Sequence, residues 1–138
     1  MIVRDVMSKK LITIPHQSNL RECAHKMNYF NVGLLPVFEH GKVIGAITDR
    51  DICCRAIGFG CDLETTNVKD IMTSHVIFCY DDQPCSEAAN LMKTKRVRRL
   101  LVMNRDQQMV GILSVDDLAH YSHDLAGQAI DSTSPILV

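Results

Sequence analysis

The stretch GAITDRDI, residues 45–52, returns in near copy as GILSVDDL at residues 111–118. In both copies a glycine and two apolar residues precede a hydroxyl residue, and an aspartate follows three positions after that hydroxyl. An apolar run that ends in a hydroxyl residue and a carboxylate is typical of a strand that stops where a helix begins. Two such junctions at corresponding places in one chain indicate a duplicated structural unit.

The duplication extends over most of the chain. VRDVMS at residues 3–8 aligns with VKDIMT at residues 68–73. One additional residue in the second of two matching turns (HGK against RDQQ) then brings Gly45 onto Gly111 and Asp51 onto Asp117. Apolar periodicity predicts the order strand, helix, strand, strand, helix in each half. The sequence therefore predicts an α/β fold made of two tandem modules.

Neither module is expected to fold alone, because roughly 60 residues bury too little apolar surface. We expect the two to pack through their sheets about a pseudo-twofold axis. The expected modules are residues 1–62 and residues 63–123, joined through the glycine-containing polar segment GFGCDLETTN. Residues 124–138 are expected to form a C-terminal helical extension and tail, whose end, PILV, packs on a neighbouring chain or frays.

Composition excludes several classes of function. The 138 residues carry a formal net charge of −1, so neither nucleic acid nor an anionic membrane is favoured as a bulk electrostatic partner. No apolar run approaches the length that crosses a bilayer, and the N-terminus lacks the apolar segment of a signal peptide. We therefore expect a cytoplasmic protein that contacts neither nucleic acid nor membrane.

The cysteines and histidines give little sign of metal or redox chemistry. The six cysteines contain no CxxC pair, and most are expected to be buried structural thiols. A thiol-based redox sensor is an alternative that requires an exposed cysteine of low pKa. His120 and His123 have a helical spacing that could share a metal ion, but the sequence supplies no third ligand nearby, so we expect no metal site.

The hydroxyl and carboxylate of each junction have two interpretations. Thr48 and Ser114 could cap helices, with Asp51 and Asp117 complementing the positive helix start. A cap needs only one of the two groups, however, and both recur. A carboxylate can accept two hydrogen bonds from a vicinal diol, a hydroxyl can bond a sugar or phosphate oxygen, and helix amides favour an anion. The duplication therefore favours a ribonucleotide site.

At this point the chain resembles a tandem pair of CBS domains, often called a Bateman module, up to about residue 122. The resemblance implies two related clefts between modules that bind adenosine-containing ligands: AMP, ADP, ATP, and sometimes S-adenosylmethionine or NAD. It also implies a homodimer. The motifs that carry it, in order, are VRDVMS, GLLPV and VIGAITDRDICCRAIGFG, then VKDIMT, VRRLLV and MVGILSVDDL.

The resemblance also implies which residues line each cleft. One cleft would combine the first junction with the second half, and comprises Thr48, Asp51, Val97, Arg98 and Arg99. The other would combine the second junction with the first half, and comprises Ser114, Asp117, Val32, Gly33 and Leu34. Adenine is expected against the first strand of a half, with backbone groups reading its edge, at Ile12 and Thr13 or at Ile77 and Phe78.

The two clefts are not equal. Arg98 and Arg99 belong to the basic run KTKRVRR, and on a strand successive residues would point to opposite faces. One arginine could then face a phosphate, to which its planar fork is suited, although a solvated basic sheet edge is the alternative. Gly33 and Leu34 leave the first half without such a basic pair. We therefore expect one bound nucleotide per chain, in the cleft with Thr48 and Asp51.

The sequence thus predicts a stand-alone regulatory protein and not an enzyme, because no nucleophile–base set accompanies the aspartates. No obligatory cofactor is expected. An adenine nucleotide would favour one arrangement of the modules and so act on the dimer or on an unknown effector protein. The alternative is a structural dimerisation or protein-interaction module without a ligand.

Overall fold

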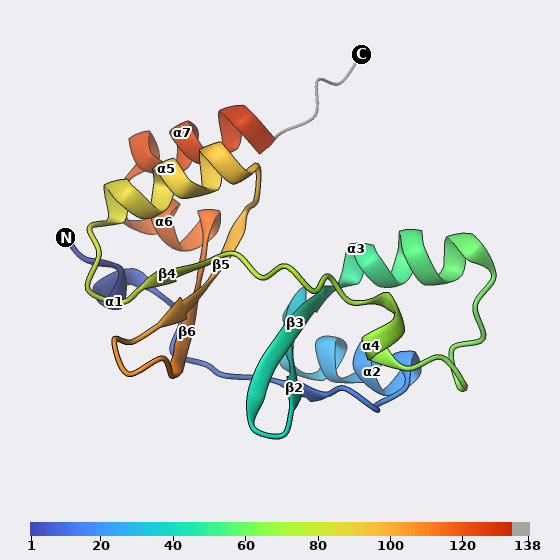
Figure 1. The fold of residues 1–138 in the computed structure, drawn as a ribbon. Coiled ribbons are helices and arrows are strands. Elements are labelled where there is room, and N and C mark those ends of the chain that lie inside the picture. Colours follow the sequence, from blue (N-terminus) through green and yellow to red (C-terminus); the bar gives the residue numbers. More distant parts are fainter. Residues whose placement is uncertain (134–138) are drawn as a thin grey trace, which may run out of the picture. The chain divides into compact units, whose positions relative to one another are not determined.

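A computed structural model describes the backbone of residues 1–133 and the side chains of residues 1–130 (Figure 1). The chain divides into two compact units. The first-repeat unit is Ile12–Val76, and the second-repeat unit joins Met1–Leu11 to the chain from Ile77 onward. Each contains a three-stranded sheet and helices, which confirms the predicted α/β fold with two repeats.

In the first-repeat unit, β1 pairs in parallel with β2, and β2 pairs antiparallel with β3. The helix after β3 continues from a short α-helical start through a π-helical turn to a final 3-10 turn. The elements are β1 (Ile14–Pro15), α2 (Leu20–Phe30), β2 (Leu34–Glu39), β3 (Lys42–Thr48), α3 (Asp49–Asp51), the π-helical turn (Ile52–Ala56), the 3-10 turn (Ile57–Phe59) and α4 (Val68–Ile71).

The second-repeat unit has the same strand order and the same pairing senses. Here the helix after the third strand is an ordinary α-helix, and a further helix, α7, packs on both α5 and α6. The elements are α1 (Val3–Val6), β4 (Phe78–Tyr80), α5 (Cys85–Lys95), β5 (Arg99–Met103), β6 (Met109–Ser114), α6 (Val115–Tyr121) and α7 (His123–Thr133).

Local sequence explains how α2 is positioned. The Asn19 side chain accepts a hydrogen bond from the Glu22 amide at 2.8 Å, which satisfies one of the amides exposed at a helix start. Asn31 ends the helix in the left-handed conformation, with φ 53°. Leu20, Cys23 and Met27 form the buried face, as their spacing predicts. The end of α2 therefore delivers the chain to the start of β2.

The first segment of each sequence repeat packs on the sheet of the other repeat. The Ser8 amide donates to the Ile112 carbonyl at 2.9 Å, and the Thr73 amide donates to the Ala46 carbonyl at 2.9 Å. The spatial division therefore falls after residues 11 and 76. The boundaries expected from the sequence, residues 1–62 and 63–123, follow the repeat along the chain. They do not account for the first segment of each repeat, which belongs to the compact unit of the other repeat.

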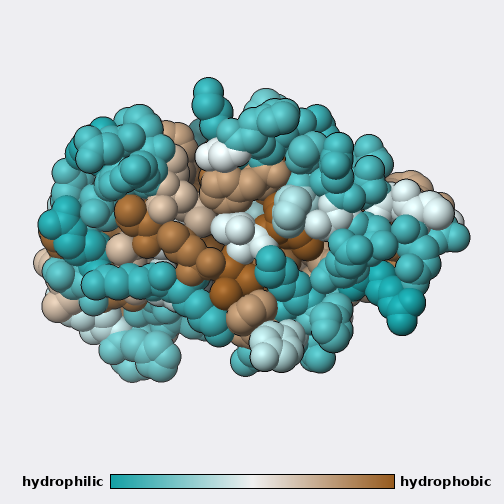
Figure 2. Space-filling view, turned by 90° about the horizontal axis from the view of Figure 1, so that it is seen from below, coloured by the Kyte–Doolittle hydropathy of each residue, from teal (hydrophilic) through white to brown (hydrophobic). Residues whose placement is uncertain are grey.

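Each unit has its own hydrophobic core, and hydrophilic side chains dominate the surface seen in Figure 2. The expected C-terminal helical extension is present as α7, in which Ala126 and Ala129 are buried. The PILV segment lies outside the described residues. Among residues 1–133, no helix is long and apolar enough to cross a membrane.

Candidate functional site

Three predicted segments converge at one end of the sheet in the first-repeat unit. Residues 12–13 lead into β1, residues 32–34 lead into β2, and Thr48 ends β3 beside Leu34. β1 and β2 are parallel, and β3 is antiparallel to β2. The starts of β1 and β2 and the end of β3 therefore lie at the same end of the sheet. The sequence-predicted residues of this repeat therefore gather in one place.

The second-repeat unit repeats this arrangement. Residues 77–78 lead into and begin β4, residues 97–99 lead into and begin β5, and Ser114 ends β6 opposite Arg99. Within this unit the arginines thus lie at the same sheet end as Ser114 and Asp117. The predicted grouping of Thr48 and Asp51 with Val97–Arg99 joins residues of different units and stays a prediction.

Both junctions are reciprocal capping boxes. In the first, the Asp51 amide donates to the Thr48 hydroxyl at 3.1 Å, and the Thr48 amide donates to Asp51 Oδ2 at 2.9 Å. Ser114 and Asp117 make the same two bonds at 3.1 and 2.9 Å. The expectation that a cap needs only one of these groups is therefore wrong here, because the box uses hydroxyl and carboxylate together.

The boxes leave hydrogen-bonding capacity at the junctions. Each carboxylate has about four lone-pair positions, of which the box uses one, and each hydroxyl keeps its own hydrogen as a donor. Thr48, Asp51, Ser114 and Asp117 are all half-buried, so their side chains are partly accessible. The box therefore fixes the orientation of each aspartate while acceptor positions on both carboxylate oxygens remain.

The amides at the start of α3 do not provide the expected anion site. The Asp49 amide donates to the Gly33 carbonyl at 3.0 Å, and the Arg50 amide donates to Asp49 Oδ1 at 2.8 Å. The Asp51 amide is already in the capping box. Any phosphate at this junction would therefore have to be held by side chains.

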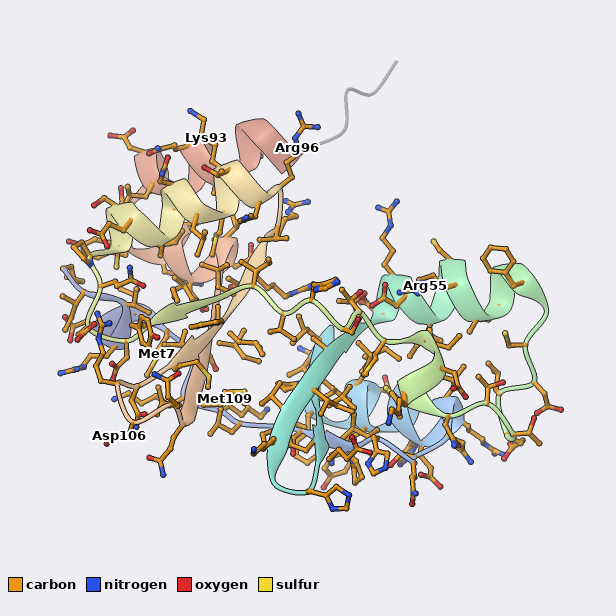
Figure 3. The ribbon with its side chains drawn as sticks, viewed as in Figure 1. Met7, Arg55, Lys93, Arg96, Asp106 and Met109 are labelled. Carbon is orange, nitrogen blue, oxygen red and sulfur yellow. The ribbon has the colours of Figure 1, made fainter. Side chains whose placement is uncertain are left out.

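The basic run supplies side chains of that kind. Arg98 precedes β5, which begins at Arg99, so the expectation that the two alternate along a strand does not apply. Both are exposed, and no described carboxylate forms an ion pair with either. Lys93 and Arg96, which belong to the same run, project from the C-terminal end of α5 (Figure 3). The arginines are therefore available to an anion.

The residues expected to contact adenine differ between the repeats. The Thr13 carbonyl accepts a hydrogen bond from the amino group of Lys26 on α2. In the second-repeat unit, the Ile77 carbonyl accepts from the Leu101 amide at 3.2 Å, and the Phe78 ring meets the Tyr80 ring edge-on at 5.6 Å. The sequence does not indicate this contact, because a lysine on an amphipathic helix is ordinarily solvated.

The six thiols differ in burial: three are buried, two are exposed and Cys61 is half-buried. Burial raises the pKa of Cys23 and of Cys79 to about 12, so both stay protonated at neutral pH. Cys85 is also buried and its pKa is raised by the same desolvation. Cys53 and Cys54 are exposed, so the expectation of mostly buried thiols does not extend to this pair. Among the side chains that the structure describes, no group of three histidine, cysteine or acidic residues could hold a metal ion.

Comparisons with known proteins assign the repeats. The family model of the CBS domain matches residues 3–56 and again residues 68–124. The CBS domain-containing protein YhcV of Bacillus subtilis is 32% identical over 134 residues, which cover 96% of this chain and 94% of that protein. Inosine-5'-monophosphate dehydrogenase of Methanocaldococcus jannaschii is 31% identical over 83% of this chain, but the match spans only 22% of that enzyme.

Solved structures have the same fold. The CBS domain protein TA0289 from Thermoplasma acidophilum superposes with a TM-score of 0.87 at 20% identity, over 96% of this chain and 75% of that one. The CBS domain pair of protein MJ0100, solved in complex with 5'-methylthioadenosine and S-adenosyl-L-methionine, superposes with a TM-score of 0.77 at 29% identity, over 88% of this chain and 94% of that one. The chain therefore belongs to the CBS domain family and carries two CBS domains in tandem.

Proposed function

We propose that this protein is a regulatory module that binds an adenosine-containing ligand at its strand-to-helix junctions. The observation that carries the proposal is the half-buried aspartate of each capping box, fixed by two hydrogen bonds yet retaining carboxylate lone pairs. The complex of the MJ0100 domain pair with two adenosine compounds supports the ligand class.

In this proposal Asp51 accepts hydrogen bonds from the two ribose hydroxyls, and Thr48 donates its hydroxyl hydrogen to a sugar or phosphate oxygen. Because the box holds the carboxylate before the ligand arrives, little side-chain freedom is lost on binding. Arg98 or Arg99 binds the phosphates, since their guanidinium groups have no described ion-pair partner. One site per chain, that of Thr48 and Asp51, is occupied first.

We propose that the ligand acts by shifting a conformational equilibrium of the protein, and that it is not a substrate. A ligand that binds one arrangement of the domains more tightly than another shifts the population toward it by its differential affinity. That shift would act on a second copy of the chain or on an effector protein. AMP, ADP, ATP, NAD and S-adenosylmethionine are the candidate ligands.

The test uses Asp51→Asn, and not alanine, because the amide oxygen of asparagine can still accept the Thr48 amide and preserve the capping box. The substitution removes the charge and replaces one acceptor oxygen with a donor. The melting temperatures of wild type and of each variant are measured with and without each candidate ligand. A ligand that binds only the native state raises the melting temperature by mass action. Asp116→Asn, an exposed neighbour of Asp117, is the matched control.

We expect at least one ligand to raise the melting temperature of wild type and Asp116→Asn, and to raise that of Asp51→Asn much less. An undiminished response in Asp51→Asn would contradict the ribose assignment. No response from wild type to any of the five compounds would favour the second candidate function, a ligand-free interaction module. The capping boxes favour that alternative, because they explain the hydroxyl and the carboxylate without a ligand.

A further inference from the structure

Five basic side chains lie where α5 ends and β5 begins. All five are exposed, and no described carboxylate forms an ion pair with any of them. The formal net charge of the whole chain is only −1, so the remaining residues are acidic on balance. Like charges this close in sequence repel one another and lower stability unless an anion neutralises them. The five are Lys93, Lys95, Arg96, Arg98 and Arg99.

The fold does not require these charges. The first repeat forms the same helix end and the same strand start, and none of the five matching residues is basic. Cations in the last turn of a helix complement its dipole, but only Lys93 and Lys95 lie in that turn of α5. By the offset that aligns residues 3–8 with residues 68–73, the matching residues are Asn28, Phe30, Asn31, Gly33 and Leu34.

Arg96 has a backbone conformation that suits its counterpart in the first repeat better. It ends α5 in the left-handed region, with φ 56° and ψ 45°. Asn31 ends α2 in the same conformation, with φ 53° and ψ 51°. Asparagine adopts this conformation several-fold more readily than other residues with a side chain. An arginine here therefore lowers the stability of the helix end, which points to a use for its charge outside the fold.

The basic run has two parts. Arg98 and Arg99 lie at the start of β5, where Arg99 pairs with Ser114 at the end of β6, and they are the proposed partners of a ligand phosphate. Lys93 and Arg96 instead project outward from the end of α5 (Figure 3). Together with Lys95 they form a separate cationic surface, which we call the α5 patch. The proposed ligand makes no use of this surface.

We propose that the α5 patch is a docking surface for an acidic segment of a partner protein. Clusters of basic side chains recognise acidic motifs through charge-assisted hydrogen bonds, and three exposed cations within four residues suit a short run of carboxylates. Binding such a segment would also relieve the repulsion within the basic run. The inference goes beyond the proposed function, because it gives the chemistry of a protein partner and does not require a nucleotide.

Two other polyanions fit the surface less well. Single-stranded nucleic acids are held by stacking on aromatic side chains as well as by cations, and residues 93–99 contain no aromatic residue. The acidic balance of the remaining residues also opposes a long polyanion. Stable binding to a membrane surface needs exposed apolar side chains beside the cations, and the single valine or leucine-type residue of this run, Val97, is half-buried.

The probe is a fluorescein-labelled decaglutamate peptide, and its binding to the whole protein is measured by fluorescence anisotropy at low ionic strength. The triple variant Lys93→Gln, Lys95→Gln, Arg96→Gln removes the charges of the α5 patch. The matched control, Lys9→Gln, Lys42→Gln, Arg50→Gln, removes three exposed charges elsewhere and changes the net charge equally. From the usual contribution of exposed ion pairs, we expect the patch variant to bind roughly tenfold more weakly and the control to stay within about twofold of wild type.

Arg96→Asn separates binding from folding. The substitution places at the end of α5 the residue type that ends α2, so we expect a higher melting temperature than that of wild type. It also removes one charge of the α5 patch, so we expect the peptide to bind about threefold more weakly. A purely structural role for Arg96 predicts the opposite change in melting temperature and no change in binding.

Several results would overturn the inference. Wild type that does not bind the peptide refutes it directly, and equal weakening in the two triple variants reduces the effect to net charge. Tighter binding of a single-stranded RNA or of phosphatidylserine vesicles than of the peptide assigns the surface to another class of partner. If the patch variant does not fold, unchanged peptide binding by Arg96→Asn refutes the inference instead. The adenosine ligand is tested separately by the melting temperatures of Asp51→Asn, so the two proposals can fail independently.

Discussion

Gly45 and Met72 lie so close together that no side chain fits between them. A Cβ atom added to Gly45 would lie 2.6 Å from Met72 Sδ and 2.6 Å from the Thr73 carbonyl oxygen. The same relationship recurs at Gly111, whose added Cβ would lie 2.6 Å from the Ser8 carbonyl oxygen. The glycine of each repeated motif is therefore required by the segment that crosses over from the other repeat.

Gly45→Ala should accordingly destabilise the first-repeat unit, because the backbone at Thr73 must move to admit a methyl group. Overpacking of this kind costs about 1–3 kcal/mol of the free energy of unfolding. Gly127→Ala is the control: it lies in α7 with nothing within 4 Å of the added atom, and should stabilise by about 0.5–1 kcal/mol. Urea denaturation measures both. An unchanged urea midpoint for Gly45→Ala would show that the segment containing Met72 and Thr73 can move without loss of stability.

Stability should fall in acid through Glu39. A hydrogen bond from Lys69, at 3.2 Å, holds the pKa of Glu39 below its ordinary value. A carboxyl group whose pKa is lower in the folded state stabilises fully above its unfolded pKa of about 4.3, and that stability is lost as the pH falls through the folded value. We expect Glu39→Gln to flatten the acid limb of the melting temperature against pH below about pH 5.

Glu22→Gln is the control for that measurement, since no described cation forms an ion pair with Glu22. Its acid limb should follow that of wild type. If Glu39→Gln follows wild type as well, the interaction of Lys69 with Glu39 contributes nothing measurable to stability, as is common for exposed pairs.

Alkylation should separate the cysteines. Cys53 and Cys54 are exposed and should react with iodoacetamide in the native protein within minutes to hours. Cys23 and Cys79 are buried, and with a pKa of about 12 they form little thiolate. We expect mass spectrometry to find these two modified only when the protein unfolds. Native-state labelling of Cys23 at the rate of Cys53 would show that the core of the first-repeat unit opens readily.

The sequence by itself determined the duplication, the order of elements in each half and the family. Repeated motifs such as GAITDRDI and GILSVDDL report these features directly, because strand and helix periodicity and helix-start signals act over a few neighbouring residues. The sequence also singled out Thr48, Asp51, Ser114 and Asp117, which do occupy two matching junctions at corresponding sheet ends.

Only the tertiary structure decided how those residues are used and which segments pack together. The capping boxes explain the hydroxyl and the carboxylate together. The Asp49 amide, one of the helix-start amides expected to bind an anion, instead donates a hydrogen bond to the Gly33 carbonyl. Residues 1–11 pack with the chain from Ile77 onward, although the two segments are far apart in the sequence. Lys26 on α2 contacts Thr13, which precedes β1. Such pairings depend on where the backbone returns, and no local pattern encodes that.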